Sequence, residues 1–196
     1  MDLSLLKGTR IIALDIETTD LSIQKAYVRE LGAAEYVDGV YVRGSSALFS
    51  GGKCGPGAVA VHGITDEMVK DKPQFVKLAG HFCTFVNDGG HGRPADIIGH
   101  NVSKYDLPII SKWIKETDHK LKGNGTDGRI RVIDTCLLAR RHFQFPSNKL
   151  KDLCEIFGIQ HGKHRALGDA MCTWELFLKM IQMNGWKDLS KVYEIA

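Results

Sequence analysis

Two acidic residues interrupt an apolar stretch near the start of the chain. Asp15 and Glu17 lie in residues 10–20, where apolar and mostly β-branched side chains predict a β-strand: Ile11, Ile12, Leu14 and Ile16. Side chains two positions apart in a strand point to the same face, so both carboxylates project together. At roughly 5–7 Å apart they repel each other by a few kcal/mol at the effective dielectric of a protein surface. The spacing predicts a bound cation, which we interpret as a pair of divalent metal ions.

A third acid, Asp106, follows a short apolar segment at residues 97–98 and stands three residues after Ser103. Local capping explains this spacing simply, with Ser103 as the N-cap of a helix and Asp106 as a favourable acid in its first turn. A buried strand that ends just before Asp106 would also deliver it to the carboxyl edge of a sheet, where α/β ligand sites lie. The local pattern leaves both interpretations open.

A fourth acid, Asp169, lies near the start of the last predicted helix, with Leu176 and Met180 further along the same side. A carboxylate at the head of an apolar stripe needs a donor or a metal, because burying it bare is very costly. His164 precedes it in a loop, and a histidine that can reach an acid cluster is a candidate general base. His161 is the competing candidate. The His-x-x-His spacing also fits part of a zinc site, but no cysteine or further histidine stands near enough to complete it.

Length and charge set the broad class. The 196 residues suit one domain, 1–196, with a substantial core, and the net charge of +3 permits a polyanionic partner without requiring one. Between residues 112 and 151 there are ten lysines and arginines but four acids. Such a cluster is usually a solvated surface, and nucleic-acid contact is the alternative.

The five cysteines are widely spaced and include no Cys-x-x-Cys pair, which is typical of reduced, buried thiols in an intracellular protein. The chain has no basic segment followed by a long apolar run, and no apolar stretch of the ~18 residues that a membrane span needs. The expected location is therefore cytoplasmic, with no targeting signal and no membrane partner.

The remaining elements alternate between strands and helices. Residues 28–37 and 40–49 predict a hairpin around Asp38-Gly39, and the glycine-rich residues 50–57 predict a flexible connector without a nucleotide-binding fingerprint. Further elements are expected in order: a helix turn capped by Thr65, a helix from Pro73 to the glycines at 89–90, strands at 97–98 and 130–133, a helix that follows the segment 99–106, and helices at 135–142, 148–157 and 165–183. This order predicts an α/β fold with a mixed sheet of about five strands flanked by helices.

Three motifs together resemble those of the DnaQ-like exonucleases, in the DEDDh branch of the DEDD superfamily. They are Asp15-x-Glu17-Thr-Thr, Gly-His-Asn101 with Asp106 five residues on, and His164-Arg-Ala-Leu-x-Asp169. The resemblance covers residues 9–182 and implies an RNase H-like fold and 3′→5′ exonuclease activity with two Mg²⁺ or Mn²⁺ ions. By position it implies Asp15, Glu17, Asp106 and Asp169 as metal ligands and His164 as general base. Four carboxylates independently favour such hard ions over zinc.

The resemblance also implies substrate-binding positions. Thr18 and Thr19 would contact the terminal nucleotide, His62 and Ile64 would line the pocket for the 3′ base, and Asn101 would contact the adjoining nucleotide. We interpret His100 as structural. Asp134 also aligns with a family aspartate, but its expected helix cap accounts for it without a metal. Asp20 departs from the family, which commonly has glycine after the two threonines.

The predicted function is a metal-dependent exonuclease acting on the 3′ end of single-stranded or frayed DNA and releasing nucleoside 5′-monophosphates. The form of the first motif and the segment Val-His-Gly-Ile at residues 61–64 look closer to polymerase proofreading subunits, so a polymerase or repair complex is a candidate partner. An exoribonuclease that trims RNA 3′ ends is the alternative enzyme. A non-catalytic polymerase accessory module on the same fold is the alternative from another class, disfavoured because all five catalytic positions are filled.

Overall fold

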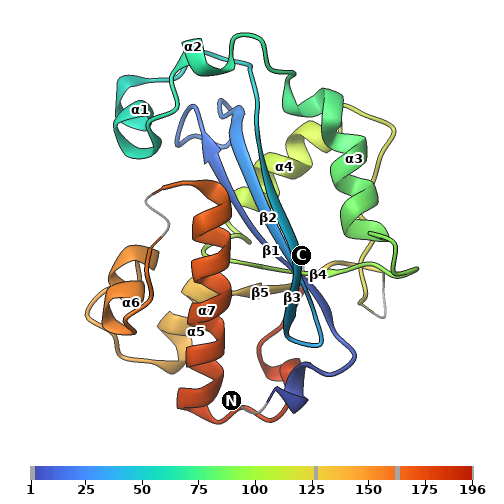
Figure 1. The fold of residues 1–196 in the computed structure, drawn as a ribbon, viewed down its shortest axis with the longest axis vertical. Helices are drawn as coiled ribbons and strands as arrows, with labels where there is room; N and C mark the ends of the chain where they lie inside the picture. The colour runs from blue at the N-terminus through green and yellow to red at the C-terminus, as the bar shows by residue number, and fades with distance from the viewer. Residues whose placement is uncertain (1–2, 126–127, 162–163, 196) are drawn as a thin grey trace.

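The computed structural model describes residues 3–125, 128–161 and 164–195. A twisted sheet lies between two helical layers (Figure 1): α7 (Ala166–Asn184) crosses one face, and α3 (Phe75–Asn87) and α4 (Asp106–Ile114) cover the other. The short helices α1 (Pro56–His62) and α2 (Asp66–Val69) lie at one end of the long strands. This layered arrangement confirms the predicted α/β fold.

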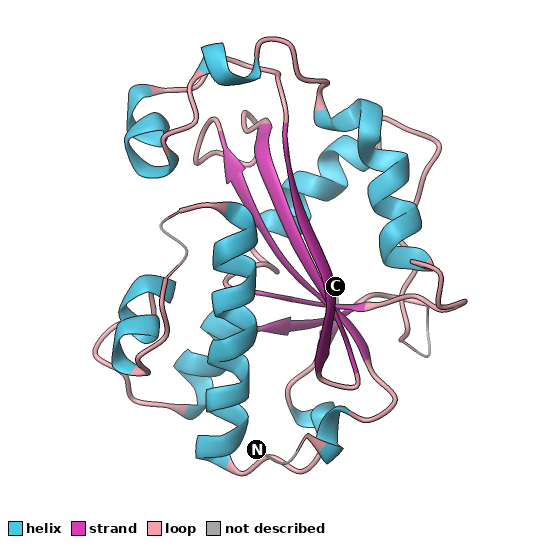
Figure 2. Ribbon diagram, in the orientation of Figure 1, coloured by secondary structure: helices cyan, strands magenta, loops and turns pink. Residues whose placement is uncertain are grey.

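Within the described residues the sheet has six strands in the order β3-β2-β1-β4-β5-β6. The strands are magenta in Figure 2. β1 pairs antiparallel with β2 and parallel with β4, and β4 pairs parallel with β5. The predicted mixed sheet of about five strands is confirmed, and a short edge strand, β6, adds to it by pairing antiparallel with β5. The strands are β1 (Arg10–Thr18), β2 (Val28–Val37), β3 (Val40–Leu48), β4 (Asp96–Gly99), β5 (Arg131–Asp134) and β6 (Glu194–Ile195).

The alternation of side chains along β1 divides the core into two parts, as the period of a strand requires. Ile11 and Ala13 pack in a cluster with side chains of α7, whereas Ile12, Leu14 and Ile16 pack in a second cluster with α3 and α4. Asp15 and Glu17 continue the first series. The two acids therefore lie on the α7 side of the sheet, at the carboxyl end of β1.

The predicted hairpin turn and the predicted cap by Thr65 are confirmed. Asp38 and Gly39 both take positive φ values, 52° and 82°, in the tight turn of the predicted hairpin. Thr65 caps α2 by accepting a hydrogen bond from Met68 N. The other helices are α5 (Thr135–His142) and α6 (Leu150–Ile156), with short 3₁₀ turns at Ser4–Leu6 and Leu189–Lys191.

Residues 50–57 form the predicted connector. It packs against the side chains of Tyr27 and Arg29, and these contacts were not predicted. Gly52 has a φ of 61°, and a Cβ there would lie 2.5 Å from the ring of Tyr27. The Gly52 carbonyl accepts a hydrogen bond from the buried Arg29, which also binds Asp66 of α2. Helix α1, which begins within this segment, was not predicted.

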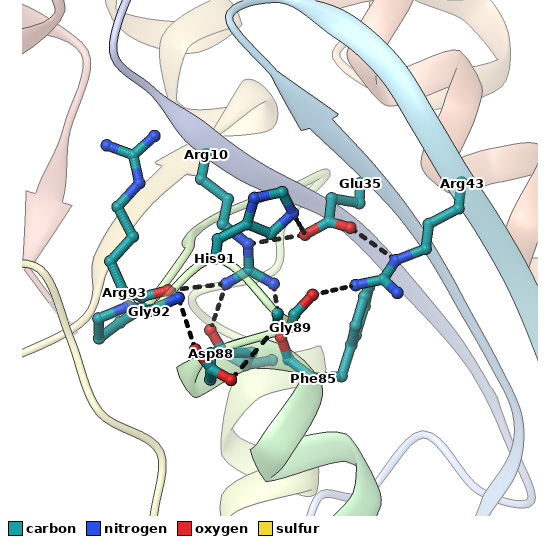
Figure 3. Close-up of polar contacts among 12 residues, drawn as sticks. Arg10, Glu35, Arg43, Phe85, Asp88, Gly89, His91, Gly92 and Arg93 are labelled. Carbon is teal, nitrogen blue, oxygen red and sulfur yellow. Dashed lines mark hydrogen bonds and ion pairs between the residues drawn. The ribbon is translucent and has the colours of Figure 1, made fainter.

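The amino end of β1 is fastened by a buried ion cluster (Figure 3). Arg10 and Glu35 are both fully buried, and Arg10 Nε donates to Glu35 Oε1 over 2.6 Å. Arg43 donates to the other oxygen of Glu35, also over 2.6 Å, and His91 lies 3.4 Å from the first. Arg10 further donates to carbonyl groups in the last turn of α3. The cluster joins the hairpin to that helix.

Two cations of the basic stretch at residues 112–151 bind groups within the fold. Lys112 donates to three backbone carbonyls in the loop before β2, including that of Ala26 over 2.7 Å. Arg131 binds the buried Asp96 through two hydrogen bonds of 2.9 Å. These two of the ten cations have partners within the fold. For the rest, a solvated surface or nucleic-acid contact stays the prediction.

Among the described residues, no helix combines the length and apolar character needed to cross a bilayer.

Candidate active site

The parallel strands bring the predicted acids to one edge of the sheet. Asp15 and Glu17 stand at the carboxyl end of β1, paired across the antiparallel register with Gly32 and Glu30 of β2. Residues opposite each other in such a pair project on the same face, so Glu30 is the direct neighbour of Glu17. Like charges in this position repel each other unless a cation lies between them.

Asp106 reaches the same edge from the first turn of α4, where it is buried. Its Oδ1 accepts a hydrogen bond of 3.0 Å from the backbone N–H of Ile16, between the two acids of β1. The N-cap of α4 is Tyr105, without a side-chain capping bond. The alternative in which Ser103 caps this helix is therefore wrong: its backbone N–H donates to Asp134 instead.

Asp134 holds the loop that precedes α4. Its carboxylate caps α5 through the N–H groups of Cys136 and Leu137 and also accepts from those of Asn101 and Ser103. Asn101 takes a positive φ of 63° at this point. All these bonds occupy the Asp134 oxygens with backbone donors, which fits its predicted role as a helix cap outside the metal set.

His100 links the same loop to the segment before α6. Nδ1 lies 2.9 Å from Thr135 Oγ1, and Nε2 lies 2.9 Å from the carbonyl oxygen of Asn148. Burial lowers the pKa of His100, so the ring is neutral at pH 7. These contacts fit the predicted structural role.

Helix α7 carries Asp169 into the site because it packs closely on β2. A Cβ at Gly32 would lie 2.1 Å from Leu167 N and 2.2 Å from the carbonyl carbon of Ala166, so only glycine allows this approach. Arg165, directly before the helix, donates to both oxygens of Glu30 over 3.0 and 2.9 Å. The hairpin thereby fixes the first turn of α7.

Glu17, His164 and Asp169 converge, with one potential ligand atom from each lying within 4.8 Å of the others. His161 Nε2 also lies 3.5 Å from Asp169 Oδ1, and the two imidazole rings are 5.2 Å apart. The structure thus brings both candidate bases to the acids. The cavity has a volume of about 490 Å³ and is lined by these side chains together with Asp15, Ile16, His100, Lys149, Leu150, Lys151 and Asp152.

Burial and mutual repulsion raise the pKa values of three of these acids. Burial, then the charges of Asp106 and Glu17, raises the pKa of Asp15 well above its usual value. Burial, then the charge of Asp169, raises the pKa of Glu17 to about 8. The pKa of Asp106 rises to about 7, again mainly through burial. Such shifts mark carboxylates without enough nearby positive charge. The all-oxygen donor set of the acids fits a hard divalent ion such as Mg²⁺ or Mn²⁺.

The sequence itself identifies the family. A model of the RNase_T family, described as exonucleases, matches residues 12–177. The chain belongs to this exonuclease family. DNA polymerase III subunit epsilon of Haemophilus influenzae is 30% identical over 186 residues, which span 90% of this chain and 69% of that protein. The same subunit of Aquifex aeolicus is 30% identical, over 91% of this chain and 83% of its own length.

Solved exonucleases share the fold. Exonuclease X, in complex with 5′ overhanging duplex DNA, superposes with a TM-score of 0.66 at 25% identity, covering 91% of this chain and 93% of its own. Exonuclease I of E. coli, in complex with a dT13 oligonucleotide, gives a TM-score of 0.76 at 16% identity over 90% of this chain and 42% of its own, a likeness of fold. The resemblance to DnaQ-like exonucleases and the RNase H-like fold are confirmed. The chain is a nuclease by family.

The predicted substrate residues of this exonuclease surround the loop after β1. Thr18 Oγ1 lies 2.7 Å from the Tyr105 hydroxyl, and Thr19 Oγ1 accepts from the backbone N–H of Tyr27. His62 accepts a hydrogen bond from Ile64 N at Nδ1, which leaves Nε2 to donate to the Thr18 carbonyl over 3.3 Å. Burial lowers the pKa of His62, consistent with this neutral ring. The side chains of the two threonines, His62 and Ile64 are buried, so they shape the loop, and nucleotide contact remains their predicted role.

Sequence reasoning missed three residues of the exonuclease site. Glu30 was not selected, although it is one of three charged residues in β2, with Arg29 and Glu35, and a charge within a strand can signal a buried partner. Lys149 and Lys151, which line the cavity, were noted only as part of the basic stretch. Their helix lies against α7 in the fold, and nothing local in the sequence predicts that contact.

Proposed function

We propose that this exonuclease removes nucleotides from the 3′ end of single-stranded or frayed DNA and releases nucleoside 5′-monophosphates. The observation that carries the proposal is that Asp15, Glu17, Asp169 and His164 line one cavity, with Asp106 beside them, bonded to the N–H of Ile16. The raised pKa values of Asp15, Glu17 and Asp106 indicate a site that is complete only with bound cations. The preference for DNA rests on the relatives named DNA polymerase III subunit epsilon and on exonuclease X with duplex DNA.

The four carboxylates would hold two divalent ions. When bound, these ions neutralise charge on the scissile phosphate and lower the pKa of a water molecule. His164 accepts the proton from the attacking water, since it stands within reach of Glu17 and Asp169. Lys149 and Lys151 line the same cavity and would contact phosphate oxygens of the strand. The buried Asp106 holds its place through the N–H of Ile16.

The proposal extends to partners and location. The similarity to epsilon subunits favours association with a DNA polymerase. A cytoplasmic location fits the cysteines, which are all buried and form no disulfide in the part of the chain that the structure describes.

The direct test is digestion of matched 3′-labelled and 5′-labelled oligonucleotides, in DNA and RNA and in single- and double-stranded form. We expect Mg²⁺ or Mn²⁺ to support stepwise loss from the 3′ end of single-stranded DNA, with mononucleotide products, and EDTA to stop it. Faster digestion of RNA would replace the DNA assignment with the exoribonuclease alternative. A wild-type protein that binds single-stranded DNA but never cleaves it would support the accessory-module alternative.

A further inference from the structure

We propose that Glu30 and Arg165 are positioning residues that hold His164 in its catalytic conformation. This inference rests on the proposed function, since it assigns His164 as the base. The two oxygens of Glu30 receive Nε and Nη2 of Arg165 over 3.0 and 2.9 Å. One of these oxygens also accepts the backbone N–H of Ala166 over 3.2 Å. A guanidinium group that donates two hydrogen bonds to one carboxylate fixes both the distance and the relative orientation of the two side chains.

The backbone of His164 explains why such a fixed point is needed. His164 has a φ of 57°, in the left-handed region that residues other than glycine rarely adopt. Such a conformation persists only where the surroundings determine it. Arg165 and Ala166, the next two residues, are both bound to Glu30. The chain after His164 is therefore fixed by three hydrogen bonds to one buried acid.

The contacts of Glu30 are those of a residue that positions the backbone, and not those of a metal ligand. It is 1% exposed, and its oxygens are already occupied by the guanidinium group and the backbone donor. Those bonds, which outweigh the opposing effect of burial, lower the pKa of Glu30. Its cross-strand neighbour Glu17 points into the cavity on the same face. One carboxylate of the pair is thus available to a metal while the other binds Arg165.

We call the ion pair of Glu30 and Arg165 the clamp. It acts on His164, which lies near two acids of the site. A potential ligand atom of His164 lies within 4.8 Å of those of Glu17 and Asp169, and small errors in such a geometry reduce catalysis strongly. Partners that orient an active-site group typically contribute 10–100-fold to activity. We expect Glu30→Gln to lower kcat by about 10–100-fold. KM for oligonucleotide and the affinity for Mn²⁺ should stay nearly unchanged.

A double-mutant cycle with His164→Ala tests the route of the effect. If Glu30 acts through His164, adding Glu30→Gln to His164→Ala gives no further loss of kcat. Multiplicative losses would overturn the proposal, as would an unchanged kcat in Glu30→Gln alone. Loss of Mn²⁺ binding in Glu30→Gln, measured by calorimetry, would instead make Glu30 a ligand. Arg165→Lys, which keeps the charge but not the fork, should retain more kcat than Arg165→Met.

A readout independent of catalysis separates this proposal from the proposed function. In NMR spectra of the folded protein, the Cε1–Hε1 signal of His164 should shift towards its random-coil position in Glu30→Gln and Arg165→Met. Glu35→Gln, the same change elsewhere on the strand, should destabilise the protein but leave that signal in place. If the wild type lacks nuclease activity, the proposed function fails while this signal still tests the clamp. An unmoved signal in Glu30→Gln overturns the clamp whether or not the enzyme is active.

Discussion

The two ends of the β1–β2 pair hold acids in opposite electrostatic situations. At the amino end of β1, Glu35 is contacted by Arg10, Arg43 and His91 (Figure 3). At the carboxyl end, Asp15 and Glu17 meet further carboxylates, and their pKa values rise. The same pair of strands therefore contains a cluster in which the charges are matched and a cluster in which they are not. Matched charges hold elements together, whereas unmatched acids leave a requirement that only an added cation meets.

The largest expected effect comes from neutralising one unmatched acid. Asp15→Asn should lower exonuclease activity by roughly 10⁴-fold or more, because several kcal/mol of charge stabilisation on the phosphate is lost. The same change should raise the melting temperature of the protein in EDTA, since it removes a repelled carboxylate. Activity assays and thermal melts measure the two effects. An Asp15→Asn variant that is active and less stable in EDTA would contradict the interpretation of Asp15 as an acid without a matching positive charge.

Histidines at the two ends provide the second test. His164→Ala should lower kcat by about 10²–10³-fold, within the range for a lost general base. His91→Ala is the matched control at the charge-matched end and should leave kcat unchanged. His161→Ala decides between the neighbouring candidates, because His161 also contacts Asp169. A large loss in His161→Ala with none in His164→Ala would move the base assignment to His161.

Breaking the matched cluster should affect stability and not chemistry. Glu35→Gln should lower the free energy of unfolding by about 3–5 kcal/mol, because it leaves the buried Arg10 without its counter-charge. The activity per folded molecule should remain that of the wild type. Urea denaturation and activity measured well below the melting temperature separate the two quantities. A stable Glu35→Gln with impaired turnover would show that the two ends are coupled.

The smallest effect is a gradual one with pH. In EDTA, the folded protein retains protons on Glu17 up to about pH 8 and on Asp106 up to about pH 7, whereas the unfolded chain releases them at roughly pH 4. The folded state binds more protons in this window, so the free energy of unfolding should fall as the pH rises from about 5 to 8. Added Mn²⁺ should stabilise the protein more at pH 8 than at pH 6. A stability in EDTA that increases over this window would contradict the assignment of unmatched charge.

The sequence allowed most elements of the fold to be predicted, because their signals are local. Alternation in β1, the Asp38-Gly39 turn and the Asp134 cap each depend on neighbours within a few residues, and each is confirmed. The Ser103 cap was wrong because α4 begins only after Tyr105, and the loop before it is held by Asp134, which accepts from the backbone N–H of Ser103 31 residues away. The two-residue β6 has no periodicity to recognise.

The sequence motifs allowed the acids and the histidine of the site to be predicted, but not the residues that hold them in place. The motif acids Glu17 and Asp169, with His164, converge as expected. The partner of Glu30 stands 135 residues away, so no window of sequence shows the pair. Lys112 looked like a surface charge, yet it binds carbonyls 86 to 89 residues earlier in the chain. Long-range pairing decides which charges are internal.

The close approach of α7 to β2 has a consequence for biosynthesis. The backbone contact at Gly32 forms only after Ala166 and Leu167 have been made, and Asp169 enters the site through that contact. Contacts of such long sequence separation form late, since loop closure must precede them. A chain still attached to the ribosome can pair β1 with β2 while lacking Asp169. A nascent chain that has not reached residue 166 therefore holds Asp15 and Glu17 without the carboxylate of Asp169.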